Sequence, residues 1–307
     1  MSWIDDLAVS RVRVICGPTA AGKSAIAAAL AIEYGAAIIS ADSRQIYRGF
    51  DIGTAKPEPS ERKAIEHVGI DVADPIERFS ASRWADMAMQ WIETHQHTTP
   101  LVTGGTGFYI RALFDPLFAA PEIDSRRRTA LEHFLNPLSL ENLRRWCHEV
   151  DPARAHLGRR QLVRAIEIAI LTGSRISDLH STEKSAATLA PAYLLVDPGA
   201  SLAARIEMRV DRMIDNGWLE EVRALDARVP DDAPAWKASG YRVMRCVARG
   251  ELDLSAARER IIIETRQYAK RQRTWFRHQL GDAPVTRLDP DDPAAESLAQ
   301  RWWKETS

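Results

Sequence analysis

Residues 11–34 of the chain read RVRVICGPTAAGKSAIAAALAIEY, and their pattern indicates the fold class. Residues 11–16 are an apolar run that stops at a glycine, which predicts a short buried strand. From Lys23 onward, apolar residues recur at helical spacing until Gly35 ends the pattern. Between the two, residues 17–24 fit the motif G-x-x-x-x-G-K-[ST]. Because a strand precedes this motif and a helix follows it, we predict a loop that binds a phosphate ester.

The chemistry of this loop depends on backbone as much as on side chains. Its glycines allow consecutive N–H groups to face one anion, and the start of the following helix adds partial positive charge. Lys23 brings a mobile full charge, and the hydroxyl of Ser24 can hold Mg²⁺. The motif alone does not identify the phosphate ester, although ATP is its usual ligand. The expected phosphate-binding residues are Gly17, Pro18, Thr19, Ala20, Ala21, Gly22, Lys23 and Ser24.

Strand and helix signals alternate in the first third of the chain. Apolar residues predict strands at 36–40 and 101–103, and Ser80 can cap a helix between them. This alternation is typical of an α/β fold in which helices flank a parallel sheet, as in P-loop NTPases. A further apolar segment at residues 193–196 is expected to return to the same sheet.

Beyond Pro116 the strand signal stops, and two helices are predicted at residues 125–135 and 140–150. We therefore predict a small all-helical insertion at residues 119–155. The core would consist of residues 1–118 and 156–307, with a C-terminal half that is mainly helical. The acidic and polar end of the chain, which contains Trp302 and Trp303, is predicted to be peripheral.

Composition limits the classes of protein that need to be considered. With 45% hydrophobic and 27% charged residues, the chain has the profile of a globular protein. The net charge of −1 excludes a uniformly basic surface for nucleic acid but leaves local basic clusters open. Three scattered cysteines are too few for a disulfide framework or a zinc site. The N-terminus lacks the features of a signal peptide, and no apolar run is long enough to span a bilayer, so we expect a cytoplasmic protein.

The segment after the second predicted strand, residues 41–57, reads ADSRQIYRGFDIGTAKP. It resembles the signature of the tRNA dimethylallyltransferase family almost residue for residue. Further blocks resemble the family in the same order, namely residues 104–109 (GGTGFY), 160–167 (RQLVRAIE), 205–209 (RIEMR), 240–242 (GYR) and 265–277 (TRQYAKRQRTWFR). The resemblance implies a monomeric, Mg²⁺-dependent enzyme that transfers a dimethylallyl group from dimethylallyl diphosphate to N6 of adenosine 37. The acceptor would be a tRNA that reads codons starting with U.

The resemblance implies Asp42, Lys23, Thr106 and Arg209 as catalytic residues. Asp42 follows the second strand, at the edge of an open parallel sheet where ligands bind, and would accept a proton from the N6 amine. Thr106 would contact the nucleotide, and Arg209 would bind diphosphate. Simpler roles remain open, because Asp42 could cap a loop and Thr106 could cap a helix. Arg205 and Arg209 lie four residues apart on one helix face and could form ordinary ion pairs.

Residues that bind tRNA are expected beside Asp42, in and after the insertion, and in the C-terminal half. Each basic cluster taken alone could be a solvated helix face, but together with the family blocks they indicate contacts to an anticodon stem-loop. The target adenine would have to leave its stack to reach the catalytic residues. The residues expected to contact tRNA are Asp42, Ser43, Arg44, Gln45, Thr106, Arg128, Arg160, Gln161, Leu162, Val163, Arg164, Lys237, Gly240, Tyr241, Arg242, Lys270, Arg271, Arg273 and Arg277.

Three other functions are compatible with parts of the sequence. An ATP-dependent kinase explains the phosphate-binding loop but not residues 41–57. An adenylate isopentenyltransferase, which prenylates free AMP, generally lacks a helical insertion and an arginine-rich C-terminal half. A tRNA-binding protein without catalytic activity would not need Lys23, Ser24 and Asp42.

Overall fold

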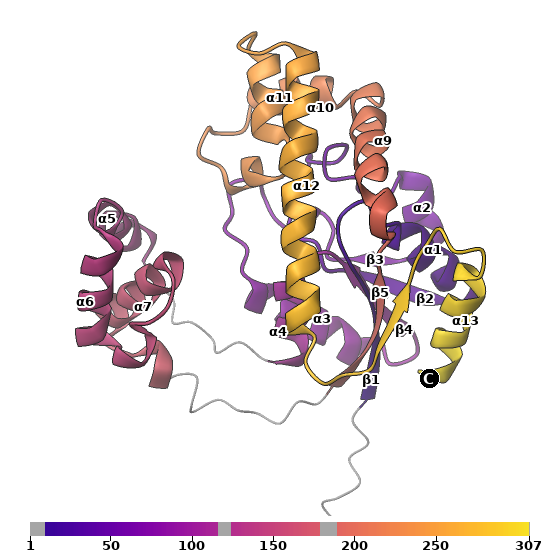
Figure 1. The fold of residues 1–307 in the computed structure, drawn as a ribbon, viewed down its shortest axis with the longest axis horizontal. Helices are drawn as coiled ribbons and strands as arrows, with labels where there is room; N and C mark the ends of the chain where they lie inside the picture. Colours follow the sequence, from indigo (N-terminus) through magenta and orange to yellow (C-terminus); the bar gives the residue numbers. More distant parts are fainter. Residues whose placement is uncertain (1–9, 116–123, 179–188, 307) are drawn as a thin grey trace, which may run out of the picture. The chain divides into compact units, whose positions relative to one another are not determined.

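The computed structural model describes residues 10–115, 124–178 and 189–306 (Figure 1). The chain divides into two compact units. The larger unit combines the N-terminal part up to Asp115 with the part from Ala187 onward, and the smaller unit is Pro116–Ala186.

The larger unit is built on a six-stranded sheet with the strand order β3-β2-β4-β1-β5-β6. Every strand pair is parallel, which confirms the predicted α/β fold of P-loop type. The short strand β3 and the edge strand β6 were not predicted. The strands are β1 Ser10–Cys16, β2 Ala36–Ser40, β3 His67–Val68, β4 Thr99–Gly104, β5 Leu189–Val196 and β6 Val285–Leu288.

Helices α1 (Lys23–Tyr34) and α13 (Ala295–Glu305) pack together on one face of the sheet (Figure 1). Trp302 and Trp303 of α13 are buried in the core that these helices share with β1. Trp303 also stacks on Tyr34 at 4.9 Å between ring centroids. The prediction of a peripheral C-terminal end is therefore wrong, because these two indoles need a hydrophobic environment and find it on α1.

The opposite face carries α3 (Ala81–Thr94) and α4 (Gly107–Phe114), whose Trp84 and Tyr109 rings stack at 5.2 Å (Figure 1). Ser80 caps α3 as predicted, since its side chain accepts a hydrogen bond from the backbone N–H of Arg83 at 3.1 Å. The short helix α2 (Pro59–Ala64) follows the segment that contains the family signature.

Four further helices of the larger unit form a group beyond the carboxyl ends of the strands (Figure 1). They are joined to the segment after β2 by Phe50, whose ring lies 5.1 Å from Trp236 and 4.8 Å from Tyr241. These helices are α9 Leu202–Asp215, α10 Trp218–Asp226, α11 Tyr241–Ala248 and α12 Leu254–Gln279. Short 3-10 helices occur at Pro152–Arg154, Gly199–Ser201 and Pro234–Lys237.

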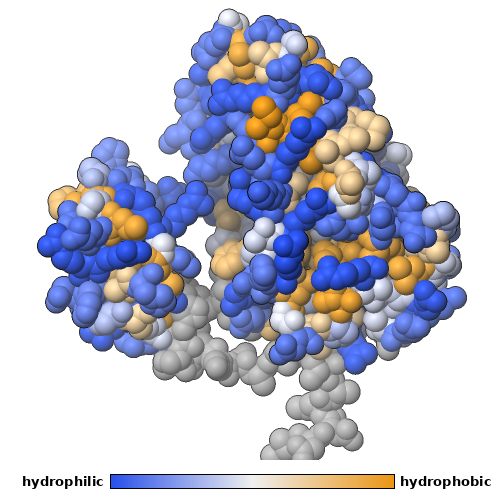
Figure 2. Space-filling view, viewed as in Figure 1, coloured by the Kyte–Doolittle hydropathy of each residue, from blue (hydrophilic) through white to orange (hydrophobic). Residues whose placement is uncertain are grey.

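Hydrophilic residues cover most of the face of the α9–α12 group that is visible in Figure 2. Helix α12 illustrates why, since basic and acidic side chains recur along its whole length and leave no long apolar stretch. Across the described ranges, no helix combines the length and the apolar character needed to cross a membrane.

The smaller unit contains α5 (Ser125–Leu135), α6 (Leu140–Val150) and α7 (Arg159–Thr172). The first two were predicted with these bounds. The third was assigned to the core by the predicted boundary at residue 155, but the unit extends to Ala186. The reason is packing, because one face of α7 completes the core of α5 and α6. That core contains Leu135, Leu143, Cys147, Leu162, Ala165, Ile166, Ile168 and Ile176.

Candidate functional site

The loop between β1 and α1 has the backbone shape of a phosphate cradle. Gly17 has a φ of 145°, and a Cβ atom at this position would lie 2.1 Å from the carbonyl oxygen of Val196, so only glycine fits. Ala20 has a φ of 62°, which costs a residue with a side chain about 1–2 kcal/mol. Helix α1 begins at Lys23, so its free N–H groups lie at the end of the loop. The predicted loop is therefore present, and its strained shape is held by its surroundings.

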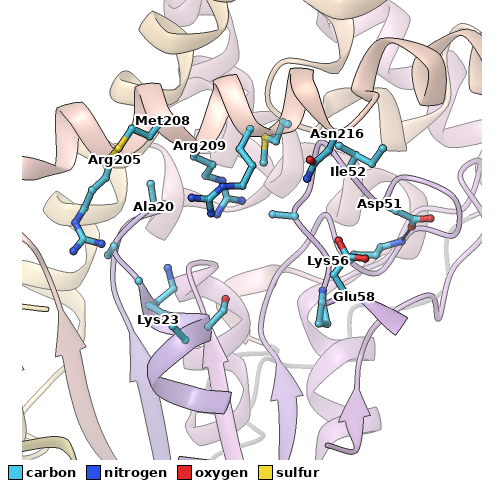
Figure 3. A pocket seen from close by; sticks show the side chains of 18 of the residues that line it. Ala20, Lys23, Asp51, Ile52, Lys56, Glu58, Arg205, Met208, Arg209 and Asn216 are labelled. Carbon is cyan, nitrogen blue, oxygen red and sulfur yellow. Dashed lines mark hydrogen bonds and ion pairs between the residues drawn. The ribbon is translucent and has the colours of Figure 1, made fainter. Parts of the chain in front are cut away.

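Two positive side chains face the cradle from different elements. Figure 3 shows Lys23 at the start of α1 and Arg209 pointing from α9 towards the same space. Lys23 donates a hydrogen bond to the carbonyl of Pro18 at 2.7 Å, and Arg209 lies 3.5 Å from the carbonyl oxygen of Thr54. Within the described residues, neither forms an ion pair with a carboxylate. Two half-buried cations that form no ion pair with a carboxylate favour binding of an anion between them.

The pKa values of Lys23 and Arg209 also indicate that positive charge is concentrated at the cradle. Burial and then the charge of Arg209 lower the pKa of Lys23 to about 8, while Asp42 acts in the opposite direction. Burial also lowers the pKa of Arg209, and Asp42 again opposes that change. The carboxylate of Asp42 is therefore within electrostatic range of both cations.

The cradle opens into a crevice of about 960 Å³ between α1, α9 and the segment after β2 (Figure 3). At its far end, Lys56 is balanced by Asp51 and Asp71, at 2.5 Å each. Positive charge without a carboxylate partner is thus found at the cradle end. Among the described residues, those that line the crevice do not include Asp42 or Thr106. They include the apolar side chains Ala20, Ala25, Ile52, Ala55, Pro57, Pro59, Met208 and Met213.

Arg205 differs from Arg209 although both belong to α9. Its guanidinium group forms an ion pair with Asp291, which also accepts a hydrogen bond from Ser201. These partners lower the pKa of the Asp291 carboxyl group. The ordinary ion-pair role that the spacing left open thus applies to Arg205 and not to Arg209.

The acceptor side is built at the tips of β2 and β4. Asp42 follows β2 and accepts a hydrogen bond from the backbone N–H of Arg44 at 2.8 Å, so it does cap its own turn. Thr106 occupies the N-cap position of α4, but its hydroxyl accepts the N–H of Ser43 at 3.0 Å rather than an N–H of the helix. Because β4 lies between β1 and β2, Thr106 stands at the strand tip between the cradle and Asp42.

A half-buried tyrosine, Tyr268, completes this side of the site. Burial and then the negative charge of Asp42 raise the pKa of Tyr268 on α12 to about 12. Burial is also the main cause of the raised pKa of Tyr109 on α4, and the negative charge of Asp42 contributes to it. Both hydroxyls therefore stay protonated at neutral pH and are available as hydrogen-bond donors.

Gln45 is engaged within the chain. Its side-chain oxygen accepts a hydrogen bond from Ser40 at 2.9 Å, and its amide nitrogen donates to the carbonyls of Thr54 at 3.3 Å and Ala55 at 3.0 Å. These bonds fix the segment that carries the family signature. Arg44 and Ser43 remain partly exposed beside Asp42.

In the smaller unit, two of the predicted arginines share one acidic partner. Arg128 and Arg164 lie 3.3 Å and 3.4 Å from the carboxylate of Glu167, which is 1% exposed. Arg160 and Gln161 are exposed, and Val163 is half-buried. The side chain of Leu162 is fully buried in the core of the three helices, where it packs, and a contact of this residue with tRNA stays a prediction.

In the C-terminal half, five of the predicted basic residues are exposed, namely Lys237, Arg242, Lys270, Arg271 and Arg277. Arg273 is instead paired with Asp197 at 2.9 Å. Tyr241 is fully buried and donates its hydroxyl to Glu221 at 2.6 Å, and Gly240 is also buried. The ring of Tyr241 packs against Phe50 and Trp218, and the contact of this residue with tRNA stays a prediction.

Two residues that position the site were not among the candidates. Glu221 accepts the N–H groups of Asp51 at 2.9 Å and Ile52 at 2.7 Å, which fixes the loop that lines the crevice. Gln272 lies inside the block at 265–277, which the sequence singled out without assigning this residue a role. Only the fold could reveal these roles, because the partners lie far apart in the sequence.

Ser24 suits a magnesium ion that arrives with a phosphate ligand. It lies exposed at the first turn of α1, beside the cradle. The described residues contain no group of three or more His, Cys, Asp or Glu side chains that could hold a metal ion by themselves. Mg²⁺ commonly takes few protein ligands and completes its shell with phosphate oxygens and water, so a single hydroxyl fits such an ion.

Comparison with known proteins agrees with this geometry. The family model described as IPP transferase matches residues 45–279, which run from the segment after β2 to the end of α12. The chain belongs to the IPP transferase family. A tRNA dimethylallyltransferase of Anaeromyxobacter sp. (strain K) is 40% identical over 299 residues, covering 95% of this chain and 96% of the relative. One of Synechococcus elongatus is 39% identical over 288 residues, covering 91% and 90%.

Solved structures give the same result. The full-length tRNA isopentenylpyrophosphate transferase of Bacillus halodurans matches with a TM-score of 0.65 at 31% identity, covering 97% of this chain and 98% of that one. A eukaryotic dimethylallyltransferase acting on tRNA matches with a TM-score of 0.79 at 25% identity, covering 95% of this chain and 77% of that one. The matches to these solved structures therefore span both the larger unit and the smaller helical unit of the chain.

Proposed function

We propose that this chain transfers the dimethylallyl group of dimethylallyl diphosphate to N6 of adenosine 37 in tRNAs that read codons starting with U. The observation that supports this most strongly is the pairing of Lys23 and Arg209, two cations without a carboxylate partner in the described residues, with Asp42 in electrostatic range. The first two suit a diphosphate, and the third suits an amine that must lose a proton. The names of the relatives point to the same reaction.

In this reaction the N6 amine attacks C1 of the donor, a C–N bond forms, and the C–O bond to diphosphate breaks. The leaving group gains negative charge, which Lys23, Arg209 and the N–H groups of the cradle stabilise. Mg²⁺ held at Ser24 would neutralise part of the same charge. The amine is a poor nucleophile because its lone pair is delocalised into the ring, so Asp42 accepts its proton. A positioned base of this kind contributes about 10²–10⁴ in rate.

On the acceptor side, we propose that an extruded adenine lies over the tip of β4, between the cradle and Asp42. Ser43, Arg44 and Thr106 border this place, and the exposed arginines and lysines of α11 and α12 would contact phosphates of the anticodon stem-loop. We further propose that the enzyme acts as a monomer in the cytoplasm, where its tRNA substrate is found.

The test supplies labelled dimethylallyl diphosphate together with either unmodified tRNA or AMP and measures which acceptor becomes labelled. A parallel reaction supplies labelled ATP and a phosphate acceptor. Label in tRNA supports the proposal. Label in AMP alone would identify an adenylate isopentenyltransferase, and phosphate transfer from ATP would identify a kinase.

Asp42→Ala should lower turnover at least hundredfold and leave the dissociation constant for tRNA unchanged. Asp282→Ala, which removes an exposed carboxylate, is the matched control. If Asp42→Ala turned over within threefold of the unaltered enzyme, the assignment of the base would be wrong.

A further inference from the structure

Gln272 connects the two halves of the site. It lies on α12 and is only 6% exposed, and both the oxygen and the nitrogen of its side-chain amide form hydrogen bonds. The oxygen accepts the backbone N–H of Thr19 at 2.8 Å, and the nitrogen donates to the carbonyl of Gly105 at 2.8 Å. These partners are 253 and 167 residues away in the sequence. One buried side chain thus joins the loop after β1 to the loop after β4.

Both partners sit directly beside functional groups. Thr19 belongs to the cradle and precedes Ala20, whose left-handed backbone is held by its surroundings. Gly105 precedes Thr106, which bonds the N–H of Ser43 next to Asp42. A shift of the Gln272 amide would therefore move the cradle relative to the acceptor side.

We propose that Gln272 is a positioning residue for the transfer reaction, which sets the distance between the cradle and the strand tips that carry Thr106 and Asp42. The part of the proposal that concerns turnover rests on the proposed function. Gln272 touches neither substrate and acts through Thr19 and Gly105. The next residue, Arg273, is held by Asp197, so α12 is anchored at this point and the amide cannot easily follow a moving loop.

The side-chain amide of Gln272 approaches Gly105 so closely that a larger residue at position 105 would displace it. A Cβ atom at Gly105 would lie 2.4 Å from the amide nitrogen of Gln272, whereas its next neighbour, the carbonyl oxygen of Gly17, would be at an ordinary 3.4 Å. Glycine at this position therefore makes room for the Gln272 amide. Its φ does not lie in the left-handed region, so alanine would be tolerated by the backbone.

The first test replaces Gln272 with methionine, which keeps the length of the side chain and removes both hydrogen bonds. Since a misplacement of about 1 Å can cost about a hundredfold in rate, we expect kcat to fall about hundredfold. The dissociation constant for inorganic pyrophosphate, measured by calorimetry, should rise about fivefold, and that for tRNA should stay within twofold. Gln267→Met, an exposed position on the same helix, is the control and should change none of these values.

The second test is a double-mutant cycle of Gly105→Ala and Gln272→Ala. Gly105→Ala alone should displace the amide and reproduce the loss of kcat, but in the Gln272→Ala background it should add less than twofold. Full additivity would overturn the proposal, because the two positions would then act independently. If the variants of Gln272 fail to fold, normal kinetics of Gly105→Ala would overturn it equally.

These measurements separate the inference from the proposed function. If the unaltered protein prenylated no tRNA, the proposed function would fail, and binding of pyrophosphate would still decide whether Gln272 shapes the cradle. A Gln272→Met variant with pyrophosphate affinity and kcat both within twofold of the unaltered protein would refute the inference. An equal loss in Gln267→Met would also refute it.

Discussion

Replacing Lys23 with methionine should make the protein more stable while it destroys binding of the donor. The side chain of Lys23 is half-buried beside Arg209, and desolvation followed by the charge of Arg209 lowers its pKa from 10.5 to about 8. The positive charge of Lys23 therefore destabilises the folded protein, and a bound anion would offset this unfavourable free energy. Methionine has a similar length and no charge, so the variant removes the cost together with the function.

The magnitude follows from the change in pKa. A fall from 10.5 to about 8 corresponds to about 3 kcal/mol of unfavourable free energy for the protonated form at pH 7. Partial exposure of the side chain reduces this figure, and loss of the hydrogen bond to Pro18 removes about 1 kcal/mol. The net gain for Lys23→Met is then about 1–2 kcal/mol, or a rise in Tm of about 4 °C.

The effect must also depend on pH in a defined direction. Between pH 8 and 10.5 the unfolded chain keeps the proton that the folded protein has lost, so the stability of the unaltered protein rises with pH in this window. The advantage of the variant should therefore shrink, and more than half of it should be lost by about pH 9.5.

The assay is thermal and urea unfolding of both proteins at pH 7, 8, 9 and 9.5, together with calorimetry of pyrophosphate. Lys237→Met, at an exposed position, is the control and should not change stability measurably. A variant of Lys23 that is less stable than the unaltered protein at pH 7 would refute the reasoning. A difference in stability that does not change with pH would refute it as well.

Three further predictions follow from the site and its supports. Arg209→Met should raise the KM for the donor about 10–100-fold, whereas Arg205→Met, which removes an arginine already paired, should change it less than threefold in steady-state assays. Gly53→Ala should cost about 3 kcal/mol in urea unfolding, because its Cβ would lie 2.1 Å from the buried indole of Trp218. Arg271→Ala should weaken tRNA binding and reduce the slope of log K against log salt by roughly 0.7–0.9 in filter binding. An unchanged donor KM, an unchanged midpoint or an unchanged slope would count against the respective prediction.

The sequence predicted those helices and strands whose hydrophobic pattern and end signals lie within one short segment. Helix α1 and strand β2 were predicted with their observed bounds, since each is closed by a glycine or a polar residue. The prediction failed where tertiary packing decides. The end of the chain appears polar, but Trp302 and Trp303 bury α13 against α1. Likewise α7 has an arginine-rich surface, and only its buried face shows that it belongs with α5 and α6.

The same distinction applies to the site. The cradle and Asp42 were predictable because a strand, a loop and the following residues are contiguous in the sequence. Glu221 and Gln272 were not, because each bonds backbone groups at least 167 residues away and carries no motif of its own. Tyr241 was assigned to tRNA because it lies in a family block, yet a buried aromatic ring in such a block can equally well be required for packing.

The order of the strands supports the proposed role of Asp42 as the base. Adjacent strands lie about 4.8 Å apart, so the tips of β1 and β2, with β4 between them, are separated by about 10 Å. A base must lie about 3 Å from the amine that it deprotonates, and the amine must approach C1 to about 3–3.5 Å. Together with the bond from C1 to the leaving oxygen, these distances nearly fill the space between the two tips. A carboxylate after β4 would stand only one strand spacing from the cradle and would leave no room for the nucleobase. In the proposed reaction, the intervening strand would therefore allow the phosphate-binding loop and Asp42 to act on two substrates at once.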